Sequence, residues 1–305
     1  MVQASLSKRE SVGVIGLGIM GSAIASHLAK AGFAVYGVDV SPVARKKMSR
    51  VLSQVDEDLG GCLGACKRLI TSLPSVAALD QIAEQIVARE RETKRRPPLV
   101  IAETSTLPHK DKLRVRDRLA TVGVVLLDCP LSGTGAQAKK RDIAVYASGE
   151  KKNIAKMKPI FEACSRKVYD VGAFGNGTYM KLVANLLVAI HNVSTAEALL
   201  FGERLGLDQM RMVKVLADGA GGSRMLAVRG PMMAKRSWSN AAMKVDMWQK
   251  DMHIISEALH EARVPAPLFA ASVPIYLAAL AQDHALDDTA AVYAVLERLA
   301  GGMRP

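Results

Sequence analysis

The stretch "SVGVIGLGIMGSAIASHLAKAGFAVYGVDV" (residues 11–40) decides the fold of the first half of the chain. A β-branched run at 11–15 leads into the spacing G-x-G-x-x-G, and a helical stretch follows. In this context the first glycine permits a tight turn, the second lets the backbone approach a pyrophosphate, and the third lets helix and strand pack closely. The helix N-terminus would then face the phosphates. The predicted dinucleotide-binding loop is Gly16, Leu17, Gly18, Ile19, Met20 and Gly21.

Asp39 follows the second β-branched run, where a carboxylate can accept hydrogen bonds from both ribose hydroxyls of a dinucleotide. A carboxylate at this place would repel a 2′-phosphate, so the sequence favours NAD over NADP. Arg45, Lys46 and Lys47 follow on the next segment and keep NADP open as the alternative.

Outside this stretch, the first half continues to alternate β-branched runs with amphipathic segments. Such alternation predicts a Rossmann-type, mostly parallel and doubly wound sheet. We expect strands at 11–17, 34–40, 67–74, 98–104, 123–130, 143–149 and 166–172, with helices at 20–31, 75–89 and 108–121.

After Gly172 the periodicity becomes helical and stays so to the end of the chain. We therefore expect an NAD(P)-binding domain over 1–173 and an all-α domain over 174–305, joined by a long helix. The expected helices are 177–205, 208–218, 223–234, 239–262, 267–281 and 287–300.

Composition limits the classes of function. The 305 residues are 50% hydrophobic and carry a net charge of +12, while the four cysteines are too scattered for a disulfide framework. No membrane span, metal site or nucleic-acid partner is expected, and the compartment is predicted to be cytoplasmic. The basic segment 88–98 is interpreted as a solvated loop rather than as a nucleic-acid site.

Lys181 lies in the apolar stretch "GNGTYMKLVANLL" (175–187), four residues before Asn185. On a helix the two side chains share one face. Burial and the nearby helix N-terminus both disfavour the ammonium form, so we expect a lowered pKa that suits proton transfer. His191 and His253 have no partners at metal-ligand spacing and are interpreted as structural.

Taken with "DCPLSGTGAQAKKRDIAVYASG" (128–149), these motifs resemble the β-hydroxyacid dehydrogenase family, typified by 3-hydroxyisobutyrate dehydrogenase, over about residues 11–300. The resemblance implies that Lys181 is catalytic and that Asn185 assists it. It also implies a substrate carboxylate site at Ser132, Gly133 and Thr134, and cofactor contacts from Leu73, Pro74, Thr106 and Lys250.

Three positions depart from the family pattern. Thr134 replaces a second glycine, Leu186 replaces a second asparagine, and Arg224 stands after Ser223 where relatives often carry Trp. All three are expected near the far end of the substrate, so Ser223 and Arg224 are candidate substrate contacts. Arg224 suits a second anionic or polyhydroxy group.

The resemblance implies an NAD(P)-dependent oxidoreductase that interconverts a small β-hydroxy carboxylic acid and its oxo or semialdehyde form. The alternatives are an NADPH-linked reductase of short aldehydes or keto acids, and a noncatalytic nucleotide-sensing or nucleic-acid-binding relative. The long apolar helix and the resemblance together suggest a homodimer or homotetramer.

Overall fold

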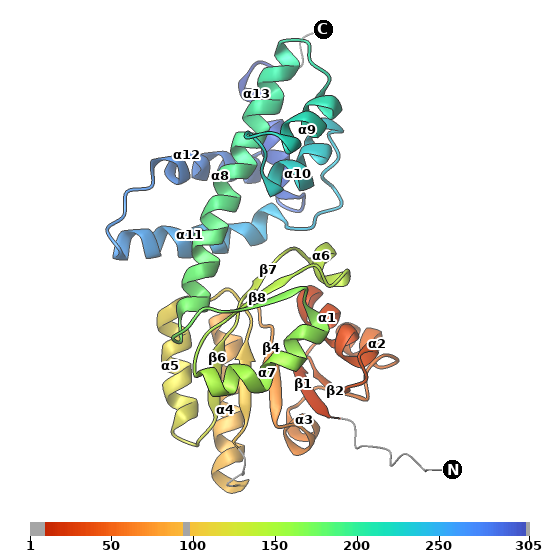
Figure 1. Ribbon diagram of the computed structural model, residues 1–305, viewed down its shortest axis with the longest axis vertical. Helices are drawn as coiled ribbons and strands as arrows, with labels where there is room; N and C mark the ends of the chain where they lie inside the picture. Colours follow the sequence, from red (N-terminus) through yellow and green to blue (C-terminus); the bar gives the residue numbers. More distant parts are fainter. Residues whose placement is uncertain (1–9, 94–97, 303–305) are drawn as a thin grey trace. The chain divides into compact units, whose positions relative to one another are not determined.

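The computed structural model describes residues 10–93 and 98–302 and separates into two compact units, Met1–Lys181 and Leu182–Pro305 (Figure 1). The first unit is built on a six-stranded parallel sheet in the order β3-β2-β1-β4-β5-β6. Its strands are β1 (Ser11–Ile15), β2 (Ala34–Val38), β3 (Gln54–Asp56), β4 (Arg68–Thr71), β5 (Val100–Glu103) and β6 (Val125–Asp128). The order reverses between β1 and β4, as expected for a doubly wound sheet.

Helices cover both faces of this sheet, because successive residues of each strand point to opposite sides. On one face, Val12 and Val14 of β1 share a core with α1 (Ile19–Lys30), α2 (Pro42–Met48) and α7 (Lys151–Cys164). On the other face, Ile15 packs with α3 (Gly60–Ala65), α4 (Val76–Thr93) and α5 (His109–Ala120). The expected Rossmann-type fold is confirmed.

A second, three-stranded sheet holds two of the expected strands. It consists of β7 (Leu131–Ser132), β8 (Ala144–Ala147) and β9 (Lys167–Asp170), with β7 antiparallel to β8. Asp128 at the end of β6 pairs with Ser148 in an antiparallel bridge, so the chain turns back here instead of extending the main sheet. The short α6 (Gly135–Lys139) links β7 to β8.

The second unit is helical. The long α8 (Asn176–Arg204) spans the division between the units, and its buried side chains recur at helical spacing from Leu182 to Leu200. The elements that follow are α9 (Gln209–Asp218), α10 (Arg224–Ala234), α11 (Val245–Glu261), α12 (Pro267–Ala281), the 3-10 turn η1 (Thr289–Ala291) and α13 (Val292–Leu299).

The helix expected over 239–262 begins only at Val245. The preceding residues form a loop in which the backbone N–H groups of Ala242 and Met243 donate to Asp288 Oδ2 at 2.9 and 3.0 Å. Asp288 is fully buried and also accepts a hydrogen bond from Arg229 Nε at 2.9 Å. This buried carboxylate holds the loop out of the helical conformation that the sequence pattern favours.

The expectations about a membrane span and about the basic segment 88–98 can be compared with the structure. By length and composition alone, α8 is long and apolar enough to cross a membrane, although core helices of soluble proteins pass the same test. Its buried residues belong to the core of the second unit, together with side chains from the helices that follow. Of the basic segment 88–98, residues up to Thr93 belong to α4, and 94–97 lie outside the described residues.

Candidate active site

The glycine loop between β1 and α1 has the geometry that a dinucleotide requires. Gly16 has φ +89°, and a Cβ there would lie 2.2 Å from the Ser72 carbonyl oxygen. A Cβ on Gly21 would lie 1.8 Å from the Gly16 carbonyl oxygen, so helix and strand can pack only without it. Around the corresponding Cβ position of Gly18, no atom of the described residues lies within 4 Å. Gly18 therefore leaves open space at the start of α1, and the loop fits a pyrophosphate.

Asp39 ties the end of β2 to this loop. Its Oδ2 accepts a hydrogen bond from the Leu17 backbone N–H at 2.6 Å, and its Oδ1 accepts one from the Ser41 N–H at 2.7 Å. Arg45 Nη1 donates to the carbonyl oxygens of Asp39 and Val40, both at 2.9 Å, and the same guanidinium pairs with Glu57. The carboxylate stands at the edge where a ribose would bind, while the nearest arginine is held by local partners.

The loops after β4 and β5 are joined by a hydrogen bond. The Leu73 backbone N–H donates to Ser105 Oγ at 2.7 Å, which fixes the loop of Leu73 and Pro74 against the loop of Thr106. Pro74 is exposed, and Leu73 and Thr106 are half-buried. Both loops leave the carboxyl ends of parallel strands, the edge where such sheets bind ligands.

The Ser132–Gly133–Thr134 segment connects β7 to α6. Gly133 has φ +135°, and a Cβ there would lie 2.7 Å from Ile143 Cγ2, so this position requires glycine. Thr134 forms a capping box with Gln137: its hydroxyl accepts from the Gln137 N–H, and its own N–H donates to Gln137 Oε1. Thr134 therefore has a structural role in starting α6, which the spacing T-x-x-Q indicates in the sequence.

The first turn of α8 is capped by side chains from the sheet. Asp128 accepts hydrogen bonds from the Thr178 N–H at 2.7 Å and from Thr178 Oγ1 at 2.9 Å. Ser148 Oγ accepts from the Gly177 N–H at 3.0 Å. These groups satisfy N–H groups that a helix start leaves without intrahelical partners, and the Asp128 carboxylate is favoured at that end of the helix dipole. Analysis of the sequence missed this role of Asp128.

Lys181 lies one turn further along α8 and is half-buried, so the burial expected for it is only partial. The neighbouring side chains of Met180 and Val183 are exposed. Asn185 is buried, and its Nδ2 donates to Asp251 Oδ2 at 2.9 Å. Lys250 Nζ lies 3.1 Å from the other oxygen of the same carboxylate, Oδ1.

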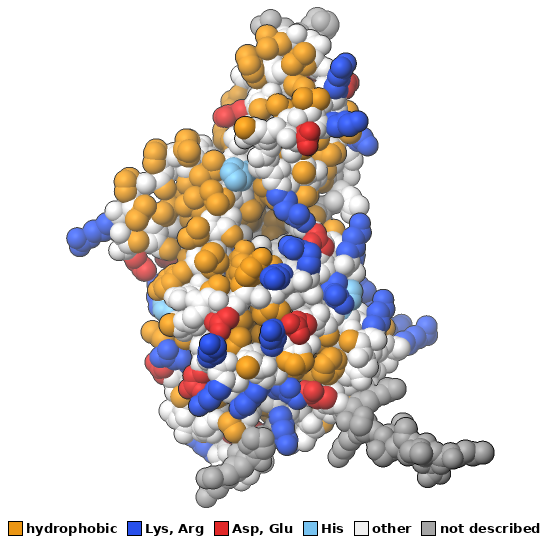
Figure 2. Space-filling model, viewed as in Figure 1, with side chains coloured by type: hydrophobic (Ala, Val, Ile, Leu, Met, Phe, Trp, Pro, Cys, Tyr) orange, Lys and Arg blue, Asp and Glu red, His pale blue; other side chains and the backbone are white. Residues whose placement is uncertain are grey.

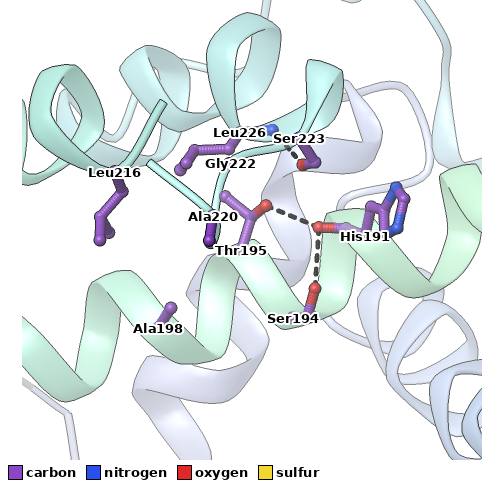
Figure 3. A pocket seen from close by; sticks show the side chains of 10 residues that line it. His191, Ser194, Thr195, Ala198, Leu216, Ala220, Gly222, Ser223 and Leu226 are labelled. Carbon is purple, nitrogen blue, oxygen red and sulfur yellow. Dashed lines mark hydrogen bonds between the residues drawn. The ribbon is translucent and has the colours of Figure 1, made fainter. Parts of the chain in front are cut away.

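Ser223 lines a pocket of about 250 Å³ in the second unit (Figure 3). Across it, Ser194 and Thr195 of α8 donate from their hydroxyls to the His191 carbonyl oxygen at 3.2 and 2.6 Å. Ser223 caps α10 by accepting the Leu226 N–H at 3.0 Å, and Arg224 is exposed at the first position of that helix. The pocket and its hydroxyl lining were not predicted.

Metal ligation and thiol chemistry gain no support from the described residues. Within 10–93 and 98–302, no group of three His, Cys, Asp or Glu side chains is placed to hold a metal ion. All four cysteines are buried, and burial is the main cause that raises the pKa of the Cys129 and Cys164 thiols.

Two family models match the chain and together cover most of it. Residues 11–172 match the NAD-binding domain of 6-phosphogluconate dehydrogenase. Residues 175–296 match the NAD-binding domain of NADP-dependent 3-hydroxyisobutyrate dehydrogenase.

Curated relatives match over nearly the whole chain. L-threonate dehydrogenase of Pectobacterium atrosepticum is 30% identical over 92% of this chain and 92% of its own length. The 2-hydroxy-3-oxopropionate reductase of Escherichia coli K12 is 26% identical over 95% of this chain and 98% of its own. A solved structure of Mycobacterium tuberculosis 3-hydroxyisobutyrate dehydrogenase shares the fold, with a TM-score of 0.84 at 24% identity, covering 95% of this chain and 99% of that one.

These relatives are dehydrogenases and reductases of small hydroxy acids, so the noncatalytic alternative is not favoured. The family models and the glycine loop agree on a dinucleotide cofactor. The chain belongs to the β-hydroxyacid dehydrogenase family and is an NAD(P)-dependent oxidoreductase that acts on hydroxy acids.

Proposed function

We propose that the chain interconverts a small β-hydroxy carboxylate and its oxo or semialdehyde form, with Lys181 as the general acid and base. One observation carries this assignment. The first turn of α8, directly before Lys181, is bound to Asp128 at the carboxyl end of β6. The glycine loop leaves the carboxyl end of β1 in the same parallel sheet. The first turn of α8 and the glycine loop therefore both lie at the edge where such sheets bind ligands.

The chemistry divides between cofactor and chain. Bound NAD(P) supplies the hydride acceptor at its nicotinamide ring. Lys181 takes the hydroxyl proton of the substrate during oxidation and returns it during reduction. Asn185 contacts the same substrate oxygen, and its amide is oriented by the hydrogen bond to Asp251. Lys250 lies beside that carboxylate and contacts the cofactor.

Ser132 and Gly133 hold the substrate carboxylate. The positive φ of Gly133 gives the loop a course in which backbone N–H groups and the Ser132 hydroxyl can converge on an anion. Thr134 contributes by fixing the start of α6, because its hydroxyl and N–H are both used in the capping box. This arrangement presents the reacting carbon for transfer.

The substrate carries further hydroxyl or anionic groups beyond its carboxylate. Ser223 and Arg224 bind this far end, where the guanidinium of Arg224 suits an anionic or polyhydroxy group. The relatives that act on L-threonate and 2-hydroxy-3-oxopropionate take polyhydroxy or oxo-hydroxy acids, in agreement with a polar far end.

NAD is the preferred cofactor. The Asp39 carboxylate is fixed by two backbone N–H groups at the ribose edge, where it would repel a 2′-phosphate. Arg45, the candidate partner for a 2′-phosphate, is occupied by backbone carbonyls and Glu57. The remaining cofactor contacts come from the glycine loop and from Leu73, Pro74 and Thr106.

Residues 1–173 bind the cofactor and supply the carboxylate loop, and residues 174–305 bind the rest of the substrate and form a homodimer or homotetramer in the cytoplasm. Exposed apolar side chains lie on α8 and α12, including Val183, Leu187, Leu268 and Leu277. Figure 2 shows hydrophobic side chains gathered over the helical unit, around α12. A second copy of the chain fits this apolar surface. Light scattering should give a dimer or tetramer mass that Leu277→Lys reduces; a monomeric wild type would refute the assignment.

The test of the reaction is Lys181→Ala. We expect kcat on an accepted hydroxy acid to fall by at least about a hundredfold, since general acid–base catalysis contributes about 10²–10⁴-fold. NADH affinity, followed by fluorescence titration, should stay close to wild type. Lys158→Ala, an exposed lysine on α7, is the matched control and should keep full activity. Undiminished turnover by Lys181→Ala would refute the role.

A further inference from the structure

Lys112 of α5 is a fully buried lysine with two strong partners. Its Nζ donates to Asp128 Oδ1 at 2.8 Å and to the Ser105 carbonyl oxygen at 2.7 Å. Burial acts to lower the pKa of Lys112, but the carboxylates of Asp128 and Glu103 more than offset it, so the pKa is raised. The ammonium therefore stays charged. Burying such a pair is costly compared with apolar packing, which makes its location informative.

Asp128 connects Lys112 to the first turn of α8. Besides Lys112, its carboxylate holds Thr178 through both the backbone N–H and the side-chain hydroxyl. The Asp128 carbonyl oxygen accepts from Ser148 Oγ at 2.8 Å, and that hydroxyl in turn accepts from the Gly177 N–H. The start of α8 is thus held at two consecutive N–H groups by the ends of β6 and β8.

Ser105 connects Lys112 to the two predicted cofactor loops, which follow β4 and β5. It lies two residues after the end of β5, its backbone N–H donates to the buried Glu103 at 2.9 Å, and its Oγ accepts from the Leu73 N–H. Lys112 therefore lies where the loops after β4 and β5, the end of β6 and the first turn of α8 meet. A neutral apolar side chain at 112 would fill space but would join none of them.

We propose that Lys112, Asp128 and Thr178 form a positioning network that fixes Lys181 relative to the cofactor loops. The proposal rests on the proposed function, in which Lys181 transfers the proton. Thr178 and Lys181 are three residues apart and are neighbours on the helix surface. A small shift of the first turn would move the Lys181 amine away from the transfer position without moving the glycine loop.

This role predicts a specific division of effects. Thr178→Val keeps the shape and the backbone N–H but removes the hydroxyl donor to Asp128 Oδ1. We expect kcat to fall about ten- to a hundredfold, because a misplacement of about 1 Å can cost a hundredfold. NADH affinity should stay within about twofold, since the Ser105 and Leu73 contacts are intact. Thr178→Ser restores the hydroxyl and should restore kcat.

The matched control is Ser165→Ala. Ser165 is also buried in the first unit, and its hydroxyl donates to the Phe161 carbonyl oxygen at 2.7 Å, away from the sheet edge that binds ligands. It should lower the melting temperature about as much as Thr178→Val does and leave kcat unchanged. Lys112→Met would leave the Asp128 charge buried and unpaired, so the double variant Lys112→Met/Asp128→Asn is the second test. It should weaken NADH binding as well as kcat.

The experiment compares kcat, substrate KM, NADH affinity and melting temperature in the full-length variants alongside Lys181→Ala. If Lys181→Ala is inactive while Thr178→Val has wild-type kcat, the network is refuted and the proposed function stands. If Thr178→Val and Ser165→Ala lose kcat equally, the role is merely structural and the network is again refuted. If Lys181→Ala remains active, the proposed function itself fails. Loss of kcat in Thr178→Val alone, with recovery in Thr178→Ser, supports the network.

Discussion

Replacing Gly18 by alanine should weaken cofactor binding and leave the fold intact. The backbone of Gly18 has φ −63°, which alanine adopts without strain, and no atom of the described residues lies within 4 Å of the added Cβ. Alanine is a poorer helix N-cap than glycine, which lowers the stability of the fold. It also lowers the conformational entropy of the unfolded chain, which stabilises the fold by about 0.4–1 kcal/mol. The two effects nearly cancel, so the melting temperature should change by about 2 °C or less.

The expected effect of Gly18→Ala on cofactor binding is larger than its effect on stability. The methyl group would occupy the space through which a pyrophosphate approaches the start of α1, so we expect NADH affinity to fall at least about tenfold, or about 1.4 kcal/mol. Fluorescence titration with NADH measures this, and differential scanning calorimetry measures the stability.

Gly21→Ala is the matched comparison, and it should lower stability more than Gly18→Ala does. Its Cβ would lie 1.8 Å from the Gly16 carbonyl oxygen, a backbone atom that cannot turn aside. Overpacking of this kind costs about 1–3 kcal/mol or more, which lowers the melting temperature by about 2–10 °C in a chain of this size. Wild-type NADH affinity in Gly18→Ala, or a larger loss of stability there than in Gly21→Ala, would refute the assigned roles of the two glycines.

Three further predictions address cofactor choice, the orientation of the Asn185 amide and stability at alkaline pH. Asp39→Ala should lower the ratio of NAD to NADP turnover at least about tenfold, because the 2′-phosphate is no longer repelled; an unchanged ratio in steady-state assays would contradict this. Asp251→Leu leaves the buried Asn185 amide unpaired and should cost about 1–3 kcal/mol of stability in urea unfolding, while kcat/KM falls and NADH affinity persists. Burial raises the pKa of Tyr276 to about 12, so this hydroxyl favours the folded state below pH 10, and that stability is lost as the pH rises toward 12. Tyr276→Phe removes this contribution, so its free energy of unfolding should fall by about 2–3 kcal/mol less than that of the wild type between pH 10 and pH 12. Equal slopes of unfolding free energy against pH would contradict the prediction.

The sequence predicted the parts of the fold that depend on local pattern. The β1–α1–β2 unit and the start of α8 are marked by periodicity and glycine spacing, and their observed bounds lie within two residues of the expected ones. Strands β3 and β7 are only three and two residues long, too short to give an alternating pattern. Their places in the two sheets are set by pairing with β2 and β8.

The candidate site was predictable where a residue acts through its own loop and not where it acts through distant partners. Gly16 and Gly21 were assigned from their spacing between a predicted strand and a predicted helix, and their contacts have the expected form. Lys112 stands in "HKDKLRVRDR", which has the composition of a solvated helix face. Its burial depends on Asp128 and Ser105, which only the folded sheet brings to it. The capping box of Thr134, by contrast, was visible in the sequence as T-x-x-Q and was overlooked.

The buried Asp288 has a consequence for the order in which the chain matures during synthesis. Domains generally fold as units from the N-terminus while the chain is being made. The first unit ends at Lys181, in the second turn of α8, and carries its own cores, so it can fold early. The helical unit cannot close until Asp288 has been synthesised, because that carboxylate binds Arg229 and the loop at 242–243. A chain released before this codon would contain a first unit able to fold and an Arg229 that lacks the carboxylate it pairs with in the complete chain.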